Sequence, residues 1–245
     1  MRNLFKSLHR LLYLGTVFAV FCLCFPVLYF LAKNPDKHYA KIASFRRIIS
    51  VWSLYLVGIK IEVEYDHPVD WNRTFVLCPN HTSILDITIL TFLCNKPFSF
   101  MGKEELLSNP VTRIFFKTID IPVKRDSKIS SFKAYKKAEA LLKKNYSVVI
   151  FPEGKIDDRY PPVLHPFKSG AFRMATENKI PILPIVIQDA WKILWDDGKR
   201  FGSKPGTIHV RILAPIEINE YLVNDNSTLE NIVYNRMKSV WNRHN

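Results

Sequence analysis

The sequence predicts an α/β fold, with a mostly parallel central sheet flanked by helices and an N-terminal pair of membrane-associated helices. Beyond residue 60, short apolar runs typical of buried strands alternate with segments of helical periodicity. Before that point, residues 11–32 carry no charge. Hydrophobic residues make up 48% of the 245-residue chain, which excludes a disordered protein and permits a sizeable core. We therefore expect a helix pair in residues 1–58 and a globular domain in residues 59–245.

The uncharged stretch at residues 11–32 is long enough to cross a membrane. Its 22 residues give roughly 33 Å of helix, against a hydrocarbon core about 30 Å thick. A cleaved signal peptide is the alternative, but the stretch is too long for one, and no cleavage motif of small residues follows it before Lys33. Pro26 favours a kink, and a kinked helix pair enters one leaflet instead of crossing it. The sequence leaves both membrane arrangements open.

A second helix is predicted over residues 42–56, where apolar side chains recur at helical spacing. They are Ile42, Phe45, Ile48, Ile49, Trp52, Tyr55 and Leu56. A basic amphipathic helix with Trp and Tyr suits a membrane interface, and packing on the globular domain is an equal alternative. Lys and Arg residues flank the apolar stretch, with an excess on its carboxyl side, which favours a main domain facing the cytoplasm.

The remaining elements follow from the alternation of patterns. Residues 60–65 alternate between polar and apolar side chains and predict an edge strand. Buried strands are predicted at 74–79, 98–101, 121–123, 147–151 and 182–187, with a late strand at 207–213. Helices are predicted at 84–94, 110–117, 129–144, 168–178 and 227–243.

The net charge of +13 predicts an acidic partner: nucleic acid, an anionic membrane or a phosphorylated small molecule. The charge is spread along the chain, with +5 in residues 1–66 and +8 in the remainder. A nucleic-acid-binding arm would concentrate it in one run, and the aromatic residues fall mostly at core or membrane positions, so we expect no nucleic-acid partner.

Several chemistries are excluded by motif. The four cysteines contain no C-x-x-C pair, so we expect reduced thiols and no metal site. Only 8 glycines are present, and the G-x-S-x-G, G-x-G-x-x-G and G-x-x-x-x-G-K-[ST] motifs are missing from the sequence. A serine-hydrolase elbow and a nucleotide-cradling loop are therefore not expected.

A histidine and a carboxylate stand at a predicted strand-to-helix turn. His81 and Asp86 are five residues apart in the segment Asn-His-Thr-Ser-Ile-Leu-Asp. Folded into contact, the carboxylate fixes the imidazole tautomer and makes His81 a general base for a hydroxyl. The alternative is structural, because Ser83-x-x-Asp86 is also a capping-box pattern.

Three further segments stand at or near strand ends. Glu153 lies in Phe-Pro-Glu-Gly after one strand, and Arg125 follows another. Open α/β sheets bind ligands beyond the carboxyl ends of their strands, and arginine suits a phosphate there. The alternatives are a plain turn and a solvated surface charge. Residues 180–186 form an apolar run with two prolines, which fits either an acyl-chain pocket or a core strand.

Together and in this order, the four segments resemble the glycerolipid acyltransferase family, best known for the 1-acylglycerol-3-phosphate (lysophosphatidate) acyltransferases. That family carries N-H-x-x-x-x-D, an arginine-containing motif, F-P-E-G and a proline-centred apolar motif. These match residues 80–86, 124–126, 151–154 and 180–186, and residues 167–171 resemble the segment that follows F-P-E-G. The resemblance covers roughly residues 50–215, and an N-terminal membrane helix pair is typical of the family.

The resemblance implies a membrane-bound enzyme of phospholipid biosynthesis, with residues 59–245 as the acyltransferase domain on the cytoplasmic face. His81, oriented by Asp86, would deprotonate the free hydroxyl of 1-acyl-glycerol-3-phosphate. The acyl donor would be acyl-CoA or acyl-carrier protein, giving phosphatidic acid with no metal and no other cofactor. Its partners would be these two substrates and membrane lipids.

The resemblance also implies a set of substrate-binding residues. Lys103 and Arg125 would hold the acceptor phosphate, Glu153 and Gly154 would position the glycerol, and backbone N–H groups near Ser83 would stabilise the oxyanion. The complete predicted set is Asn80, Ser83, Lys103, Arg125, Glu153, Gly154, Lys155 and Lys168.

One departure from the family pattern leaves the acceptor open. Common members continue F-P-E-G with Thr-Arg-Ser, whereas this chain has Lys155, Ile156 and Asp157. A lysine supplies charge but not the bidentate fork of an arginine. The alternatives are therefore another lysolipid, including an aminolipid, or a tafazzin-like transacylase. A basic membrane lipid-binding module is the non-enzyme alternative, and the intact His81 and Asp86 pair with F-P-E-G speaks against it.

Overall fold

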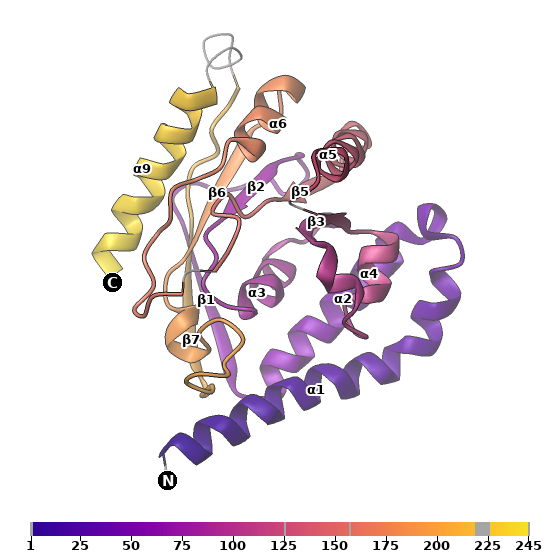
Figure 1. The fold of residues 1–245 in the computed structure, drawn as a ribbon, viewed down its shortest axis with the longest axis vertical. Coiled ribbons are helices and arrows are strands. Elements are labelled where there is room, and N and C mark those ends of the chain that lie inside the picture. The colour runs from indigo at the N-terminus through magenta and orange to yellow at the C-terminus, as the bar shows by residue number, and fades with distance from the viewer. Residues whose placement is uncertain (1, 125, 157, 219–225, 245) are drawn as a thin grey trace.

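The computed structural model describes residues 2–124, 126–156, 158–218 and 226–244. Within these residues, seven strands form one sheet in the order β1-β7-β6-β2-β5-β3-β4 (Figure 1). They are β1 (Ile59–Tyr65), β2 (Val76–Pro79), β3 (Phe98–Lys103), β4 (Ile121–Val123), β5 (Ser147–Val149), β6 (Ile182–Ile187) and β7 (Gly206–Ile212). Neighbouring strands are parallel except β6 and β7. The predicted mostly parallel sheet is confirmed, and β1 is an edge strand as predicted.

Helices cover both faces of the sheet. One face carries α5 (Lys128–Lys143), α6 (Gly170–Asn178) and α9 (Asn226–His244), which share a core with Val76 and Cys78 of β2 (Figure 1). The other face carries α3 (Leu85–Leu93), which shares a core with Leu77 of the same strand. Successive residues of a strand point to opposite faces, so both faces of β2 are buried. This burial explains why its sequence is a continuous apolar run.

Three short elements complete the fold and show where the sequence was less informative. The predicted helix 110–117 is α4 (Arg113–Thr118), which begins later because Asn109 Oδ1 accepts hydrogen bonds from Val111 N and Thr112 N. The 3₁₀ helix η1 (Glu104–Leu107) and α7 (Ala190–Ile193) were not predicted. Each is about one turn long, too short to show a period.

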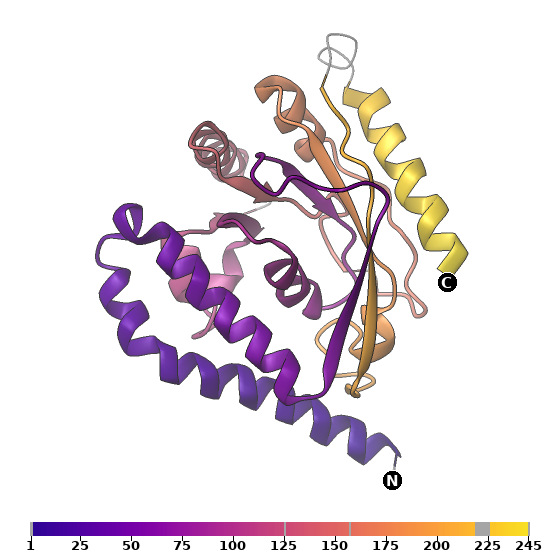
Figure 2. The same cartoon turned by 180° about the vertical axis from the view of Figure 1, so that it is seen from behind.

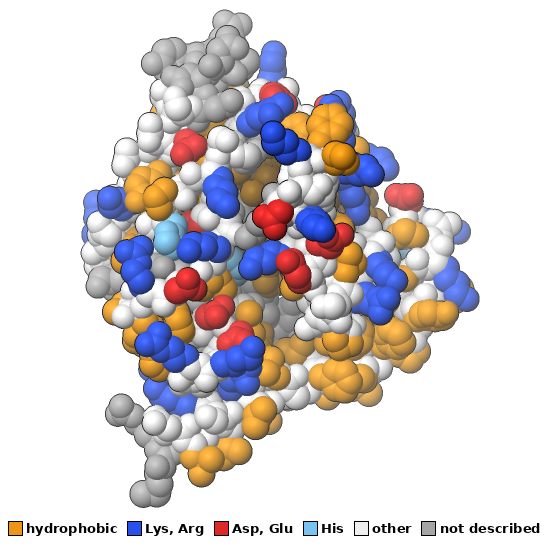
Figure 3. All heavy atoms as spheres, viewed as in Figure 1, with side chains coloured by type: hydrophobic (Ala, Val, Ile, Leu, Met, Phe, Trp, Pro, Cys, Tyr) orange, Lys and Arg blue, Asp and Glu red, His pale blue; other side chains and the backbone are white. Residues whose placement is uncertain are grey.

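The N-terminal helices are α1 (Arg2–Leu31) and α2 (Pro35–Leu56), an antiparallel pair lying along the domain (Figure 2). One face of α1 is buried along its length, at Tyr13, Phe21, Cys24, Leu28 and Leu31. The opposite face exposes large apolar side chains, seen as a hydrophobic band in Figure 3. These side chains are Leu4, Phe5, Leu8, Leu11, Leu12, Phe18, Leu23, Phe25, Val27, Tyr29 and Phe30.

The second helix has a buried face and an exposed apolar face, so its packing on the domain is confirmed and the membrane interface stays a prediction. Ile42 and Ile49 are buried against the protein, whereas Trp52 and Tyr55 are 51% and 73% exposed. The apolar stripe read from the sequence is thus divided between the core and the surface that continues the exposed band of α1.

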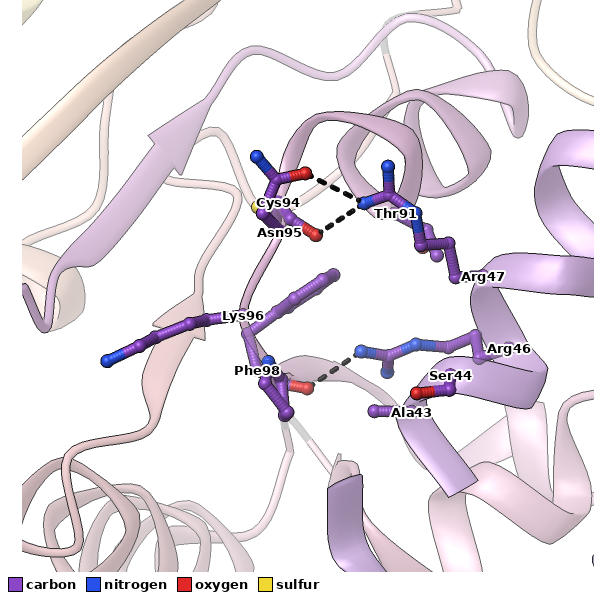
Figure 4. Close-up of a pocket in the computed structure, with 10 residues that line it drawn as sticks. Ala43, Ser44, Arg46, Arg47, Thr91, Cys94, Asn95, Lys96 and Phe98 are labelled. Atoms are coloured by element: carbon purple, nitrogen blue, oxygen red, sulfur yellow. Dashed lines mark hydrogen bonds between the residues drawn. The ribbon is translucent and has the colours of Figure 1, made fainter. Parts of the chain in front are cut away.

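A buried ion pair fastens α2 to the sheet. The Arg46 guanidinium donates to Asp120 Oδ1 at 2.6 Å and to the Phe98 carbonyl at 2.7 Å. It also lies over the Phe98 and Phe100 rings, 4.3 and 4.9 Å from their centroids. Figure 4 shows Arg46 lining a small pocket between α2 and the loop before β3. After α2, β1 begins at Ile59, and the helix pair shares its cores with the rest of the protein.

Candidate active site

Three of the predicted site residues stand at the carboxyl ends of parallel strands, on one side of the sheet. His81 follows β2, Glu153 follows β5, and Lys103 ends β3. Because these three strands are parallel neighbours, their carboxyl ends open on the same side. The pocket of Figure 4 lies at the opposite edge, since it includes Phe98 at the start of β3.

Asp86 organises the turn that carries His81. Its Oδ2 accepts hydrogen bonds from His81 Nδ1 at 2.9 Å, Thr82 N at 2.7 Å and Ser83 N at 2.9 Å. The carboxyl group is fully buried, while the His81 side chain is 19% exposed. A carboxylate only accepts, so Nδ1 carries the proton and Nε2 of the neutral ring is the basic nitrogen. Among the described residues, no group forms a hydrogen bond with Nε2.

The segment after β5 holds His81 from its other side. Glu153 Oε1 accepts from His81 N at 2.7 Å, and Oε2 accepts from His165 N at 2.8 Å. The Phe151 ring stacks on the imidazole with 4.0 Å between the centroids. Glu153 is 4% exposed, so the structure gives it a positioning role. Its direct contact with a substrate stays a prediction.

Asn80 is a correction to the predicted substrate-binding set. Its side chain is fully buried, with Oδ1 accepting from Ile187 N at 2.7 Å and Nδ2 donating to Ile187 O at 3.0 Å. Both polar atoms are therefore used to join the end of β2 to the end of β6. This position leaves no surface for a ligand, and the geometry assigns Asn80 to the frame of the site.

Ser83 and the backbone around it also differ from expectation. Ser83 is fully buried, and its Oγ accepts from Leu85 N at 3.0 Å. The backbone N–H groups of residues 82–86 all donate within the protein, to Asp86, Ser83 or Asp196. They are not available for an oxyanion. The capping-box interpretation holds only in part: Asp86 Oδ2 accepts from Ser83 N, but Ser83 Oγ accepts from Leu85 N, and Ile84, the N-cap residue of α3, makes no side-chain cap.

Lysines supply positive charge at this edge. Lys103, Lys155 and Lys168 are exposed, and the Lys168 side chain lies across Gly154. Gly154 has a φ of +73°, a conformation that favours glycine, and a Cβ there would lie 3.0 Å from Lys168 Nζ, the flexible end of that side chain. Arg125 lies outside the residues that the structure describes.

The proline-flanked apolar run is a core strand. All six residues of β6 are buried, in the cores on both faces of the sheet. Of the two interpretations of this run, the structure selects the core strand over the acyl-chain pocket, because no face of β6 is open.

Two features were missed by sequence reasoning. Asp196 pairs through its backbone with Thr82 and Ile84, and so supports the turn that carries His81. A second histidine–carboxylate pair joins His209 Nδ1 to Asp189 Oδ2 at 2.7 Å. Both depend on residues distant in sequence, and neither left a local motif.

The acyltransferase family model matches residues 60–188 of the chain. The chain is 29% identical to the mouse 1-acyl-sn-glycerol-3-phosphate acyltransferase alpha, over 80% of this chain and 68% of the mouse protein. It is 27% identical to the coconut 1-acyl-sn-glycerol-3-phosphate acyltransferase, over 69% of this chain and 53% of that protein.

A solved structure shares the fold almost throughout. The crystal structure of the 1-acyl-sn-glycerophosphate acyltransferase of Thermotoga maritima superposes with a TM-score of 0.81, over 99% of this chain and 97% of that one. At 20% identity, this likeness concerns the fold alone.

Proposed function

Because the chain belongs to the acyltransferase family, we propose that it transfers an acyl chain from acyl-CoA or acyl-carrier protein to 1-acyl-glycerol-3-phosphate, giving phosphatidic acid. The observation that carries the proposal is the His81 Nδ1–Asp86 Oδ2 hydrogen bond, which leaves the basic Nε2 open at the carboxyl edge of the sheet. The names of the relatives supply the acceptor.

The proposed reaction is a direct transfer. Nε2 of His81 removes the proton of the acceptor hydroxyl, and Asp86 stabilises the resulting imidazolium. The oxygen attacks the thioester carbonyl, the carbon–sulfur bond breaks, and the leaving thiolate takes the proton from His81. Only the imidazole and the carboxylate act, so the proposal calls for no resident cofactor.

The cysteines support direct transfer over an acyl-enzyme. Burial raises the pKa of the Cys94 thiol to about 12 and raises the pKa of Cys78 further above its usual range. A buried thiol that stays protonated is a poor nucleophile. All four cysteines are free, which supports a domain on the reducing, cytoplasmic side.

Lysines are the proposed partners of the anionic groups. The backbone N–H groups of the turn are occupied, so the acceptor phosphate and the developing oxyanion fall to ammonium groups. Lys168, held across Gly154, and Lys155 beside it are the candidates near Glu153, and Lys103 lies at the end of β3. An ammonium group at the carboxyl ends of these strands stabilises negative charge as a point charge, without the fixed bidentate geometry of an arginine.

The helix pair is proposed to lie in one leaflet of a membrane. The α1 helix is long and apolar enough to span, but its buried face packs on the protein from Tyr13 to Leu31. A helix fastened along the domain cannot cross the bilayer without carrying the domain with it. Its exposed band, continued by Trp52 and Tyr55 of α2, suits burial in the upper part of one leaflet.

An acyl-transfer assay tests the proposal. Purified full-length protein in detergent is given labelled acyl-CoA or acyl-carrier protein with lysophosphatidate, and phosphatidic acid is measured. We expect His81→Ala to lower the rate by about 10²–10⁴-fold, because it removes the general base. The matched control is His209→Ala, which removes the other carboxylate-bound histidine and is expected to keep a rate of the same order as wild type.

A panel of acceptors separates the alternatives. Transfer to another lysolipid but not to lysophosphatidate would replace the proposed acceptor and point to Lys155 as the reason. Transfer from a phospholipid with no thioester donor would make the enzyme a transacylase. Near-normal transfer by His81→Ala would refute the role of His81 itself.

A further inference from the structure

The catalytic turn is supported by a segment distant in sequence. Residues 194–204, the strap, run past the turn that carries His81. Asp196 N donates to Thr82 O at 3.0 Å, and Ile84 N donates to Asp196 O at 2.9 Å. These two bonds fix the backbone on either side of Ser83. The N–H groups of Thr82 and Ser83 are those that bind Asp86, so the strap acts on the groups that orient the carboxylate.

The strap is joined to the first turns of α1 at two places, at Ser203 and at Asp197 beside Asp196. Ser203 N donates to Lys6 O at 2.9 Å, and Arg10 Nε donates to Asp197 O at 2.7 Å. His9, 7% exposed, donates through Nε2 to the Val57 carbonyl at 2.9 Å, which leaves Nδ1 to accept from Ser203 Oγ at 2.6 Å. The strap therefore connects α1 to the catalytic turn by hydrogen bonds, with the α1 contacts at Ser203 and Asp197 and the turn contacts at Asp196.

Backbone conformation shows that this bridge is tightly specified. Asp196 has a φ of +51°, and Gly198 and Gly202 have φ values of +75° and +69°. A Cβ on Gly202 would lie 2.6 Å from the backbone of Lys6, so only glycine permits this approach. At Asp196 the left-handed conformation aims both backbone groups at the turn, and a β-branched residue resists that conformation.

We propose that the strap is a positioning element for the acyl transfer: α1 holds the strap, and the backbone of Asp196 holds the turn that sets the His81–Asp86 geometry. The inference rests on the proposed function of His81. It makes the first turns of α1 part of the catalytic support as well as of the membrane-facing surface. Asp196 touches the turn and not the reacting atoms, so it acts through His81 and Asp86.

A pair of substitutions at one position tests the role of Asp196. Asp196→Gly removes the side chain and permits a φ of +51°, whereas Asp196→Val removes it and opposes that φ. We expect Asp196→Val to lower kcat on the order of 10²-fold, as a small misplacement of catalytic groups does, with the KM values nearly unchanged. Asp196→Gly should stay close to wild type. If Asp196→Val fails to fold, Asp196→Ala is used in its place, and we expect a smaller fall in kcat.

A spectroscopic measurement separates this inference from the proposed function. Histidine is labelled with ¹⁵N in the full-length protein, and the His81 signals are assigned by their loss in His81→Gln. We expect wild type and Asp196→Gly to show the tautomer with Nδ1 protonated and Asp196→Val to lose it. The measurement needs no turnover, so an inactive wild type with these spectra would refute the proposed function and leave the positioning role standing.

The control is Leu28→Ala, which opens a cavity under α1 away from the strap, because Leu28 is fully buried. It should lower stability without changing kcat or the His81 spectrum. Equal losses in Asp196→Val and Asp196→Gly would assign the effect to the side chain and overturn the inference. An unchanged His81 spectrum in Asp196→Val, or an equal loss of kcat in Leu28→Ala, would overturn it as well.

Discussion

His81 and His209 both bind a carboxylate through Nδ1, at 2.9 Å to Asp86 and 2.7 Å to Asp189. Their surroundings differ. Asp86 is fully buried and also accepts two backbone N–H groups on the same oxygen, whereas the other oxygen of Asp189 accepts from His209 N. The histidine–carboxylate distance is therefore similar at both sites. Among the residues that the structure describes, the difference is the number of backbone N–H groups that the carboxylate binds: two for Asp86 and one for Asp189.

The second ring nitrogen separates the pairs further. Nε2 of His209 faces Glu62 Oε2 at 3.6 Å, and bonding to Asp189, with Glu62 and Glu64 nearby, raises the pKa of His209. Nε2 of His81 points to no described hydrogen-bond partner and lies at the carboxyl edge of the sheet. His209 is thus arranged to hold a proton at a partly exposed position, whereas we propose that His81 takes one from a ligand.

The strongest test of this difference between the two histidine pairs replaces Asp86 and Asp189 in turn by asparagine. Asp86→Asn removes the charge that stabilises the His81 imidazolium, and we expect the rate to fall on the order of 10²–10⁴-fold. Asp189→Asn should leave the rate of acyl transfer within the same order as wild type. The acyl-transfer assay measures both, and similar losses in the two variants would show that the His81 pair is not special.

A smaller effect is expected at the support of His81. In Glu153→Gln one carboxylate oxygen becomes an amide nitrogen, so either His81 N or His165 N loses its acceptor. A buried hydrogen bond to a charged group contributes about 1.5–3 kcal/mol, so Tm should fall by several degrees. We expect kcat to fall about tenfold, equal to about 1.4 kcal/mol of lost positioning.

Thermal unfolding followed by circular dichroism measures the fall in Tm of Glu153→Gln, and the acyl-transfer assay measures the fall in kcat. Lys168→Met changes an exposed side chain near the same loop and serves as the stability control. A Glu153→Gln protein with wild-type Tm and kcat would contradict the positioning role of Glu153.

The smallest effect concerns the pH dependence of stability at His209. Its folded pKa is raised above the usual value near 6.5, so the pair stabilises the protein below that pH. This stabilisation is lost as the pH rises through the pKa of His209 in the folded protein. Because the His209 side chain is 41% exposed, water screens the pair and the gain is at most about 1 kcal/mol, or about 2–4 °C.

Tm measured between pH 6 and 8 checks this sign. Tm of wild type should fall with rising pH by slightly more than Tm of His209→Gln, while both keep acyl transfer. If the Tm of wild type instead rose relative to that of His209→Gln with increasing pH, the proposed direction of the His209 effect would be wrong.

The comparison also explains what the sequence could predict. His81 and Asp86 are five residues apart across one turn, so a local pattern of strand, turn and helix was enough to bring them together. Asp189 and His209 are 20 residues apart, and they meet only because β7 folds back antiparallel to β6. The parallel strands were predictable because burial on both faces leaves continuous apolar runs.

The supports of the site were not predictable for a related reason. The strap acts on the turn through backbone groups of Asp196, which any residue type possesses, so no side-chain pattern marks it. Asn80 belongs to a recognisable motif, but its side chain joins the ends of β2 and β6, and this role becomes visible only in the folded sheet. The buried role of Arg46 left no mark in the sequence either, because its partner, Asp120, is 74 residues away.

The contact between α1 and the strap joins two segments that are made at well-separated times during synthesis. His9 and Ser203 are 194 residues apart, which a ribosome covers in about 10–40 s at about 5–20 residues per second. For that interval the apolar helix exists without the segment that completes the catalytic turn. The turn that carries His81 therefore gains its support from Asp196 only well after α1 has been synthesised.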